Sequence, residues 1–304
     1  VDYPQSEFDT LMLTENFELE NKKDYILQTL DQGKEIECYQ KLEPDILQEL
    51  NGRENFAYYA EAREQSSLHG TQRLSGIPVP VIFVLGMYEN LDKFAIQLAI
   101  RKILQANSFT VSQIGTKPYC ERFGFHSFPR FMLDDSYSPE EKVFLFNRYV
   151  ADIAEKEHTD AIIIGIPGAY NRLNLDYPMG LGILCYLVSQ AVTPDFAVMC
   201  TFYSEFQNET FFKYMSENCR HRLGFGIDCF HMSGTYIDMD DVKERKRLKY
   251  THISDEAVGE LIHTQFKDFG SCIFNGYSEN GEKRLSDRLF EILSAPYEEV
   301  KVVW

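Results

Sequence analysis

Residues Val81–Leu104, VIFVLGMYENLDKFAIQLAIRKIL, decide the fold of this chain. The first five are apolar and rich in β-branched side chains, the pattern of a central parallel strand buried on both faces. Gly86 ends this run, a short polar loop follows, and an amphipathic helix begins at Lys93. The stretch therefore predicts a strand, a loop and a helix, the arrangement in which backbone N–H groups and a helix N-terminus converge on a phosphate.

Similar patterns extend in both directions from this stretch. Apolar runs predict further strands at 10–14, 35–39, 161–166, 196–201, 227–231, 272–274 and 300–303, and helical periodicity predicts helices at 22–30, 44–50, 139–156, 182–191, 211–219, 255–266 and 284–293. Residues 54–63 are expected to form a short helix or strand, and the Ser-, Gln- and Gly-rich residues 65–76 a linker.

Alternating strands and helices predict an α/β protein with a mostly parallel sheet. We expect residues 1–75 to form an incomplete, Rossmann-like α/β half-domain and residues 76–304 to form a P-loop NTPase-like α/β domain. The chain begins at Val1 without a methionine, so a truncated or processed N-terminus is expected.

Charge and cysteine content restrict the partners and the compartment. The net charge of −17, with 47 acidic against 30 basic residues, would repel nucleic acid. The basic run Lys243–Lys249 has acidic residues beside it and is interpreted as a salt-bridged surface helix. An odd number of scattered cysteines, 7 in all, favours reduced thiols over a disulfide framework. No apolar run is long enough to span a bilayer, so we expect a cytoplasmic protein that binds neither membrane nor nucleic acid.

The loop after Gly86 is similar to a phosphate-binding loop with departures. Six residues separate Gly86 from Lys93, and the G-x₆-K spacing is typical of a subgroup of P-loop enzymes that includes dethiobiotin synthetase. Asp92 stands where a glycine precedes the lysine, and Phe94 stands where a Ser or Thr would hold Mg²⁺. The strand at 161–166 ends in Gly165-Ile-Pro-Gly168 and supplies no acid.

Three interpretations of this loop stay open. Asp92 could cap the helix and use the N–H groups that a phosphate needs, so that nothing is hydrolysed. Alternatively, the loop binds ATP or GTP without fast hydrolysis. In the third, an acid from elsewhere (Glu89, Asp134 or Asp135) holds Mg²⁺ and allows turnover. In each case Gly86, Asn90 and Lys93 line what remains of the anion site, and Asp92, Gly165 and Gly168 complete the set of candidate nucleotide-binding residues; no catalytic residue is assigned.

Two other groups of residues have alternative interpretations. Cys219–His221 and Cys229–His231 are C-x-H pairs that could bind zinc or an iron–sulfur cluster, but packing of unrelated side chains is favoured and no metal site is assigned. His126 lies in an aromatic loop near Cys120, where nucleophilic catalysis is the alternative to simple packing.

Several segments resemble the clostridial peptide maturation system proteins. They are IPVPVIFVLGMYENLDKFAIQLAIRK (77–102), SFTVSQIGTKPYCERFGFHSFPRFM (108–132), DAIIIGIPGAYNRLN (160–174), GILCYLVSQAVTPDFAVMC (182–200) and LGFGIDCFHMS (223–233). The resemblance implies an accessory or scaffold role in the maturation of a ribosomally made peptide, with a radical-SAM maturase or the precursor peptide as partner; an ATP- or GTP-dependent enzyme or switch is the alternative. The core is also similar to a wider group of P-loop proteins, and that likeness implies that Gly165–Gly168 faces a γ-phosphate and that Thr193–Asp195 lies near a base. The sequence leaves open whether the protein forms a homo-oligomer.

Overall fold

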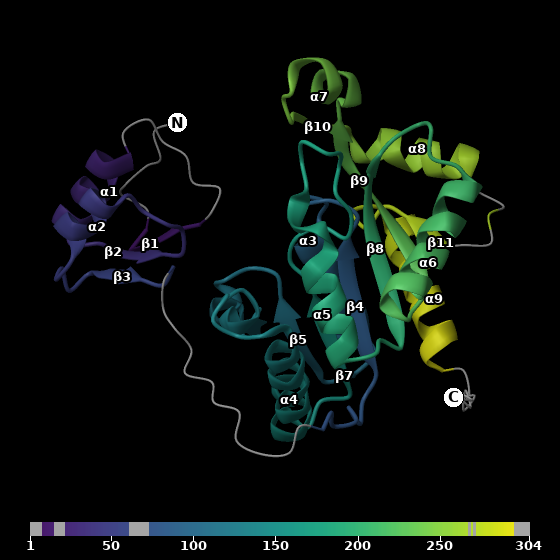
Figure 1. Ribbon diagram of the computed structural model, residues 1–304, viewed down its shortest axis with the longest axis horizontal. Helices are drawn as coiled ribbons and strands as arrows, with labels where there is room; N and C mark the ends of the chain where they lie inside the picture. The colour runs from purple at the N-terminus through teal and green to yellow at the C-terminus, as the bar shows by residue number, and fades with distance from the viewer. Residues whose placement is uncertain (1–7, 15–21, 61–72, 267–268, 270–271, 295–304) are drawn as a thin grey trace. The chain divides into compact units, whose positions relative to one another are not determined.

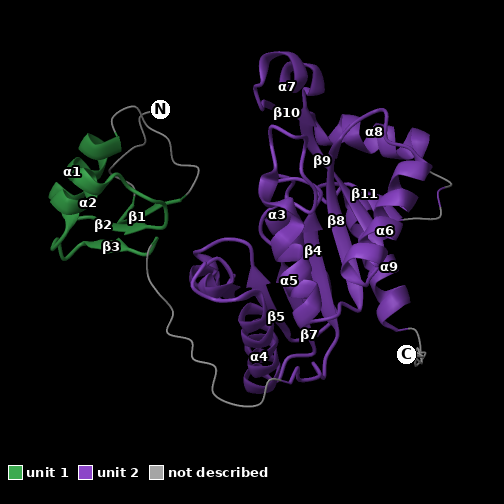
Figure 2. Ribbon diagram, viewed as in Figure 1, with its two compact units in different colours: residues 1–65 green, residues 66–304 purple. Residues whose placement is uncertain are grey.

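The computed structural model describes residues 8–14, 22–60, 73–266, 269 and 272–294. The chain divides into two compact units, residues 1–65 and 66–304 (Figure 2). The predicted strand at 300–303 and most of the predicted linker, residues 65–72, lie outside the described residues. Ser75, at the end of that linker, belongs to the second unit, because its N–H donates to the Asn147 side chain at 2.7 Å.

The first unit is a small parallel α/β sheet. Its strands β1 (Thr10–Leu13), β2 (Glu35–Cys38) and β3 (Phe56–Tyr58) pair in that order, and its helices are α1 (Lys22–Asp31) and α2 (Pro44–Leu50). Leu13, Ile26 and Ile36 are among the side chains of its buried core. The predicted strand–helix alternation is confirmed, and residues 56–58 form a strand.

The second unit contains an eight-stranded, mostly parallel sheet (Figure 1). Its strands are β4 (Val81–Gly86), β5 (Val111–Gly115), β6 (His126–Ser127), β7 (Ala161–Gly165), β8 (Phe196–Tyr203), β9 (Cys229–Ile237), β10 (Tyr250–His252) and β11 (Cys272–Phe274). They follow the order β10-β9-β8-β4-β7-β5-β6, and β11 pairs with the first half of β9. Only β10 is antiparallel to its neighbour among the pairings of the described residues. The predicted α/β class with a P-loop-like strand, loop and helix is confirmed.

Helices lie on both faces of this sheet. They are α3 (Lys93–Ala106), α4 (Pro139–Glu157), α5 (Ile183–Ala191), α6 (Glu209–Leu223), α7 (Met239–Arg245), α8 (Asp255–Gln265) and α9 (Glu279–Leu293), with short 3₁₀ turns η1 (Cys120–Phe123), η2 (Arg130–Met132) and η3 (Met179–Gly182). Helices α4, α5 and α6 neighbour one another in series, and α3 neighbours α9 (Figure 1). None of the described helices is long and apolar enough to cross a membrane.

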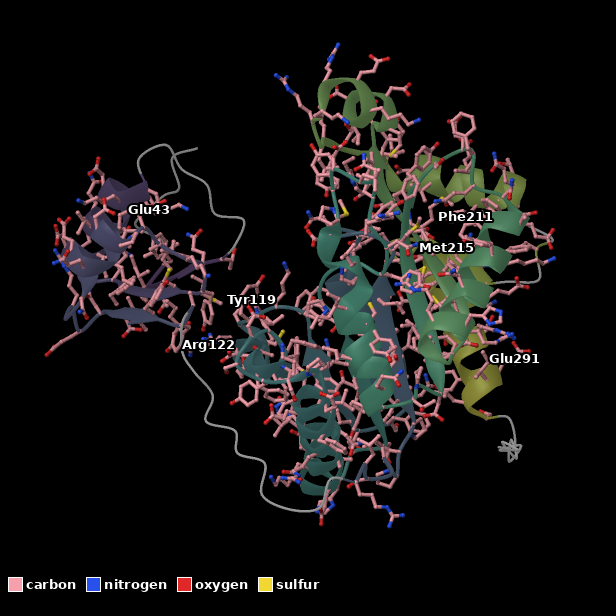
Figure 3. All side chains as sticks on the ribbon, viewed as in Figure 1. Glu43, Tyr119, Arg122, Phe211, Met215 and Glu291 are labelled. Atoms are coloured by element: carbon pink, nitrogen blue, oxygen red, sulfur yellow. The ribbon has the colours of Figure 1, made fainter. Side chains whose placement is uncertain are left out.

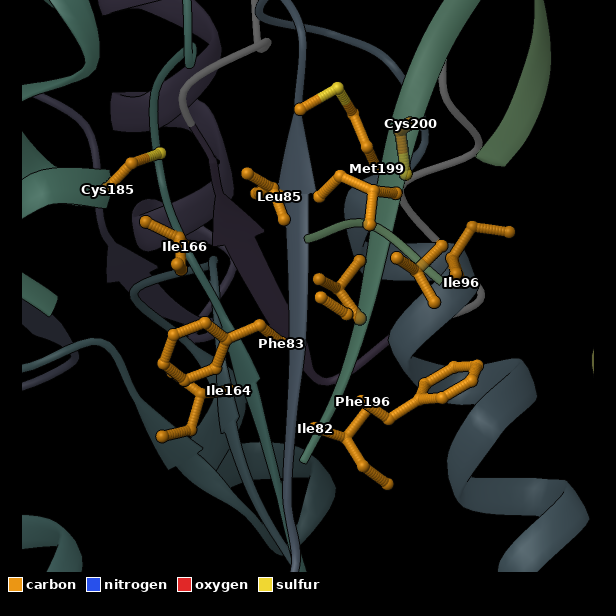
Figure 4. Close-up of a cluster of buried hydrophobic side chains, with 14 of the residues drawn as sticks. Ile82, Phe83, Leu85, Ile96, Ile164, Ile166, Cys185, Phe196, Met199 and Cys200 are labelled. Atoms are coloured by element: carbon orange, nitrogen blue, oxygen red, sulfur yellow. The ribbon is translucent and has the colours of Figure 1, made fainter. Parts of the chain in front are cut away.

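The core of the second unit surrounds β4, which lies between β7 and β8. Every residue of β4 is buried, as its uniform hydrophobicity predicts, and Phe83 and Leu85 pack with residues of both neighbouring strands (Figure 4). On α6, Phe211 and Met215 lie on the same side of the unit (Figure 3), and the adjacent Phe212 places its ring 4.9 Å from that of Phe230 on β9. The loop that leaves β4 therefore starts from a rigid, central position.

Gly165, the last residue of β7, has no room for a side chain. A Cβ atom there would lie 2.0 Å from the side-chain amide nitrogen of Gln97, a fully buried residue of α3. The glycine therefore brings α3 close to the end of β7. This is a packing role, distinct from the phosphate contact that the resemblance implies for this residue.

We expect Gly165→Ala to lower the free energy of unfolding by about 1–3 kcal/mol, because the added methyl group overpacks the contact with Gln97. In the double variant Gly165→Ala/Gln97→Ala the shorter side chain at position 97 leaves room for the new methyl group, so part of the lost unfolding free energy should be recovered. Urea denaturation followed by circular dichroism measures both. Gly259→Ala is the control, since a Cβ there meets nothing within 4 Å. Equal losses in the two glycine variants would contradict the packing role.

Candidate functional site

The loop Gly86–Lys93, called here the β4–α3 loop, leaves the carboxyl end of the central strand. Gly86 pairs with Cys200 of β8, and the Met87 N–H donates to the Cys200 carbonyl at 2.8 Å. A Cβ atom on Gly86 would lie 2.6 Å from the Tyr88 carbonyl oxygen and 2.9 Å from Lys93 Nζ. The glycine is therefore required so that the loop can turn back and the lysine can cross it.

Lys93 is buried at the start of α3 with its ammonium group directed into the loop. Its Nζ donates to the Gly168 carbonyl oxygen at 2.9 Å. Burial lowers the pKa of Lys93, because a low-dielectric surrounding disfavours the charged form. The structure thus brings together three of the residues that the sequence assigned to the site: Gly86, Lys93 and Gly168.

The segment that follows β7, residues 166–182, is hydrogen bonded to the β4–α3 loop. The Tyr170 N–H donates to the Gly86 carbonyl at 2.8 Å, and the Asn171 N–H donates to the Met87 carbonyl at 3.1 Å. Arg222 of α6 supports this segment, with its guanidinium 4.8 Å from the centre of the Tyr170 ring. The carboxyl ends of β4 and β7 therefore form one connected structure.

Asp92 occupies the N-cap position of α3, but its side chain makes no capping hydrogen bond. The carboxylate instead accepts hydrogen bonds from the Ser233 hydroxyl and, at 3.4 Å, from His231 Nε2, both on β9. The interpretation of Asp92 as a helix cap is therefore wrong. A capping residue needs extended backbone angles, and Asp92 is left-handed, with φ 61°.

The surroundings of Asp92 favour its ionised form. Burial acts to raise the pKa of this carboxyl, but hydrogen bonds from His231, Ser233 and Tyr277 outweigh it and lower the pKa below the usual value. His231 Nδ1 accepts the Gly276 N–H at 3.2 Å, so the proton of the neutral ring is on Nε2, where it faces Asp92. The carboxylate is thus held by donors from β9 and from the turn that precedes α9.

This Asp–His–Ser group has a different geometry from that of a hydrolase triad. In a triad the imidazole lies between the serine and the carboxylate and removes the hydroxyl proton. Here the carboxylate of Asp92 lies between Ser233 and His231, and Nδ1 of the histidine is occupied by a backbone N–H. The arrangement fixes the end of the β4–α3 loop and does not create an activated serine.

Asn90 is a second left-handed residue of the loop, with φ 56°. Its carbonyl oxygen lies 3.3 Å from Thr235 Oγ1, which donates to it, and its side chain hydrogen bonds to Tyr250 of β10. Asn90 is thus placed on the side of the loop that faces β9 and β10, whereas Lys93 faces Gly168.

The first N–H groups of α3 remain available for an anion. Side chains cap α4, α6, α7, α8 and α9, whereas within the described part of the chain no side chain caps α3. An uncapped helix start beside a buried ammonium group favours negative charge. The backbone N–H groups that Asp92 was expected to cap therefore do not bind its carboxylate.

Neither Phe94 nor Asp92 is placed to hold a Mg²⁺ ion, whereas the exposed Glu89 of the loop keeps a carboxylate. Phe94 has no oxygen to offer, and its ring lies 6.0 Å from that of Phe125 in the aromatic segment after η1. The Asp92 carboxylate is engaged with Ser233 and His231. Among the described residues, no group of three or more His, Cys, Asp or Glu side chains is placed to hold a metal ion. Lys93 and the backbone N–H groups at the start of α3 are the groups of this loop that would interact directly with a bound anion.

The C-x-H pairs belong to separate places. Cys219 is buried on α6 and hydrogen bonds to Tyr170, and Cys229 lies on β9 opposite Cys272 of β11. His231 contacts Asp92, so the pairs do not form a common ligand set among the described residues.

Two further expectations concern residues outside the β4–α3 loop. His126 Nε2 lies 2.6 Å from the Glu157 carboxylate of α4, which gives this histidine a hydrogen-bond partner. The placement of Thr193–Asp195 near a base is wrong. Asp195 accepts the Val81 N–H at 2.8 Å, at the amino end of β4, whereas the loop leaves the other end of the strand.

No protein-family model matches the sequence, and no curated protein does. Among solved structures, a DUF1611 family protein from Anabaena variabilis is similar over 93% of this chain and 80% of its own, at 11% identity and a TM-score of 0.61. Lower scores are found for FtsY from Physcomitrella patens (TM-score 0.38, 11% identity, 72% and 68% covered) and for an apo GTPase from Pyrococcus abyssi (TM-score 0.36, 14% identity, 73% and 100% covered). At such identity the likeness to the DUF1611 protein supports a shared α/β fold and nothing further.

We expect Asp92→Asn to lower the free energy of unfolding at neutral pH by about 1–3 kcal/mol, because charge-assisted hydrogen bonds from Ser233 and His231 are weakened. Urea titrations of both proteins measure the difference. Asp152→Asn, which removes an exposed ion pair with Lys156 on α4, is the control and should cost at most about 0.5 kcal/mol.

The same pair of proteins should show a defined pH dependence. The pKa of Asp92 is lower in the folded than in the unfolded chain, so its contribution is complete above the unfolded value of about 4 and is lost as the pH falls through the folded value. The difference in free energy of unfolding between wild type and Asp92→Asn should therefore be constant near neutral pH and should shrink toward zero under acid conditions. A difference that grows on acidification would contradict an ionised Asp92.

Proposed function

We propose that this protein is a nucleotide-binding accessory protein whose β4–α3 loop holds the phosphates of ATP or GTP without a metal ion. The observation that carries the proposal is the buried ammonium group of Lys93, for which the Gly168 carbonyl is the hydrogen-bond acceptor among the described residues. A buried cation with spare donors is stabilised by an anion. The uncapped start of α3 adds backbone N–H groups beside it.

Binding without fast turnover agrees with the residues around Lys93. Phe94 replaces the hydroxyl that would hold Mg²⁺, and the end of β7 and the residues after it read Gly165-Ile-Pro-Gly168, with no carboxylate. Charge stabilisation in phosphoryl transfer normally comes in large part from the metal. We therefore place the ATP- or GTP-dependent enzyme second, as the outcome that Mg²⁺-dependent turnover would establish.

The accessory role in peptide maturation is part of this proposal and rests on the resemblance of residues 77–235 to the clostridial peptide maturation system proteins. In that role the partner is a radical-SAM maturase or its precursor peptide. Nucleotide bound at the β4–α3 loop would act through the segment 166–182, which hydrogen bonds to the loop through Tyr170 and Asn171.

The test is calorimetric titration of the intact protein with ATP and with GTP, in Mg²⁺ and in EDTA. We expect saturable binding of at least one nucleotide, with an affinity that the metal changes by less than about threefold. Lys93→Ala should abolish the heat of binding. Lys102→Ala is the matched control, because Lys102 lies on the same helix, is exposed and pairs with Glu282 at 2.8 Å.

Absence of binding to the wild-type protein, or binding that Lys93→Ala leaves intact, would overturn the proposal. Binding that requires Mg²⁺ and is followed by phosphate release would replace it with the enzyme hypothesis. A pull-down of the purified maturase and precursor peptide tests the accessory role separately.

A further inference from the structure

The run Lys243–Lys249 is a concentration of positive charge on a chain whose net charge is −17. Helix α7 ends at Arg245, so the expected surface helix covers only the first part of the run. Arg245 pairs with Asp241 at 3.1 Å, and Lys246 pairs with Asp176. The exposed side chains of Lys243, Arg247 and Lys249 have no acidic partner among the described residues. Part of the run is therefore free of the salt bridges that the sequence predicts.

Exposed apolar side chains lie on the segment that this basic run contacts. Leu175 is 83% exposed, Leu181 49% and Ile183 58%. The Tyr177 hydroxyl donates to the Lys246 carbonyl at 2.6 Å, and the ion pair of Asp176 with Lys246 makes a second connection. Unpaired cations and exposed aliphatic side chains therefore belong to two neighbouring segments.

We propose that residues 175–183 and 243–249 form one docking surface for an acidic peptide segment that carries apolar side chains. Its carboxylates would pair with Lys243, Arg247 and Lys249, and its apolar side chains would cover Leu175, Leu181 and Ile183. The partner is argued from charge complementarity, since a protein of net charge −17 repels an acidic ligand as a whole and such a ligand is attracted only by a local cationic patch.

The exposed aliphatic side chains favour a peptide over nucleic acid, because a phosphodiester backbone offers them no apolar surface. The inference rests on the proposed function in one respect, namely that the partner is a peptide. It does not require nucleotide, so the two proposals fail separately.

The probe is a fluorescein-labelled synthetic peptide with glutamates on one helical face and leucines on the other, followed by fluorescence anisotropy. The charge reversal Lys243→Glu/Arg247→Glu/Lys249→Glu should weaken binding by about tenfold or more, and Leu175→Ser/Ile183→Ser by about threefold or more. Lys156→Glu/Lys213→Glu/Lys283→Glu makes the same change in net charge on α4, α6 and α9 and should change the affinity by less than about twofold. The titration is made without nucleotide, and peptide binding is expected there.

Equal weakening by the two triple reversals would show that only net charge matters and would overturn the proposal. So would the absence of peptide binding, or tighter binding of a labelled DNA duplex or of phosphatidylserine vesicles than of the peptide. Circular dichroism of each variant establishes that the fold is kept.

Discussion

The buried ammonium group of Lys93 is the constraint on which the arrangement around the β4–α3 loop depends. A cation can be buried only if acceptors or anions surround it, so the chain must bring a carbonyl to Nζ and leave space for the side chain to cross the loop. Gly168 supplies the carbonyl, and Gly86 leaves the space. Hydrogen bonds from Tyr170 and Asn171 then hold the two segments together.

Asp92 shows how tertiary contacts can override a strong local preference. An aspartate directly before a helix is a good N-cap, but only when its backbone is extended. In the left-handed conformation its carboxylate turns toward β9 and accepts hydrogen bonds from the side chains of Ser233 and His231. The consequence for the site is twofold, because the loop gains an anchor and the helix start keeps its N–H groups.

Much of the fold could be predicted because β4, β7 and the first five residues of β8 are apolar runs that are buried on both faces. Strand β5 (Val111–Gly115) is not among the strands predicted from the sequence, because two of its buried residues, Ser112 and Gln113, are polar. The Ser112 N–H donates to the Thr159 hydroxyl oxygen at 2.9 Å, and the Gln113 side-chain amide donates to the Gln97 side-chain oxygen at 3.3 Å. The sequence of β5 alone does not show that these polar groups have hydrogen-bond partners in other segments.

The candidate site was only partly predictable for a related reason. Spacing identified Gly86 and Lys93, which are close in sequence. Ser233 is 141 positions from Asp92, and no local rule connects them. The same limit explains Asp195, which looks like a site residue by position along the chain but hydrogen bonds at the amino end of β4.

The turn η3 limits how this protein can vary in length. Met179, Gly180, Leu181 and Gly182 all have positive φ, and a side chain on Gly182 would meet the Tyr170 carbonyl at 2.4 Å. Left-handed backbone costs a non-glycine residue about 1–2 kcal/mol, so this turn persists because both of its ends are fixed. The segment that leads into the turn is tied to the β4–α3 loop at Tyr170 and Asn171, and the residue after the turn begins α5. Insertions and deletions between residues 171 and 182 should therefore be rare among relatives, whereas the exposed Ser204–Phe206 loop before α6 can absorb them.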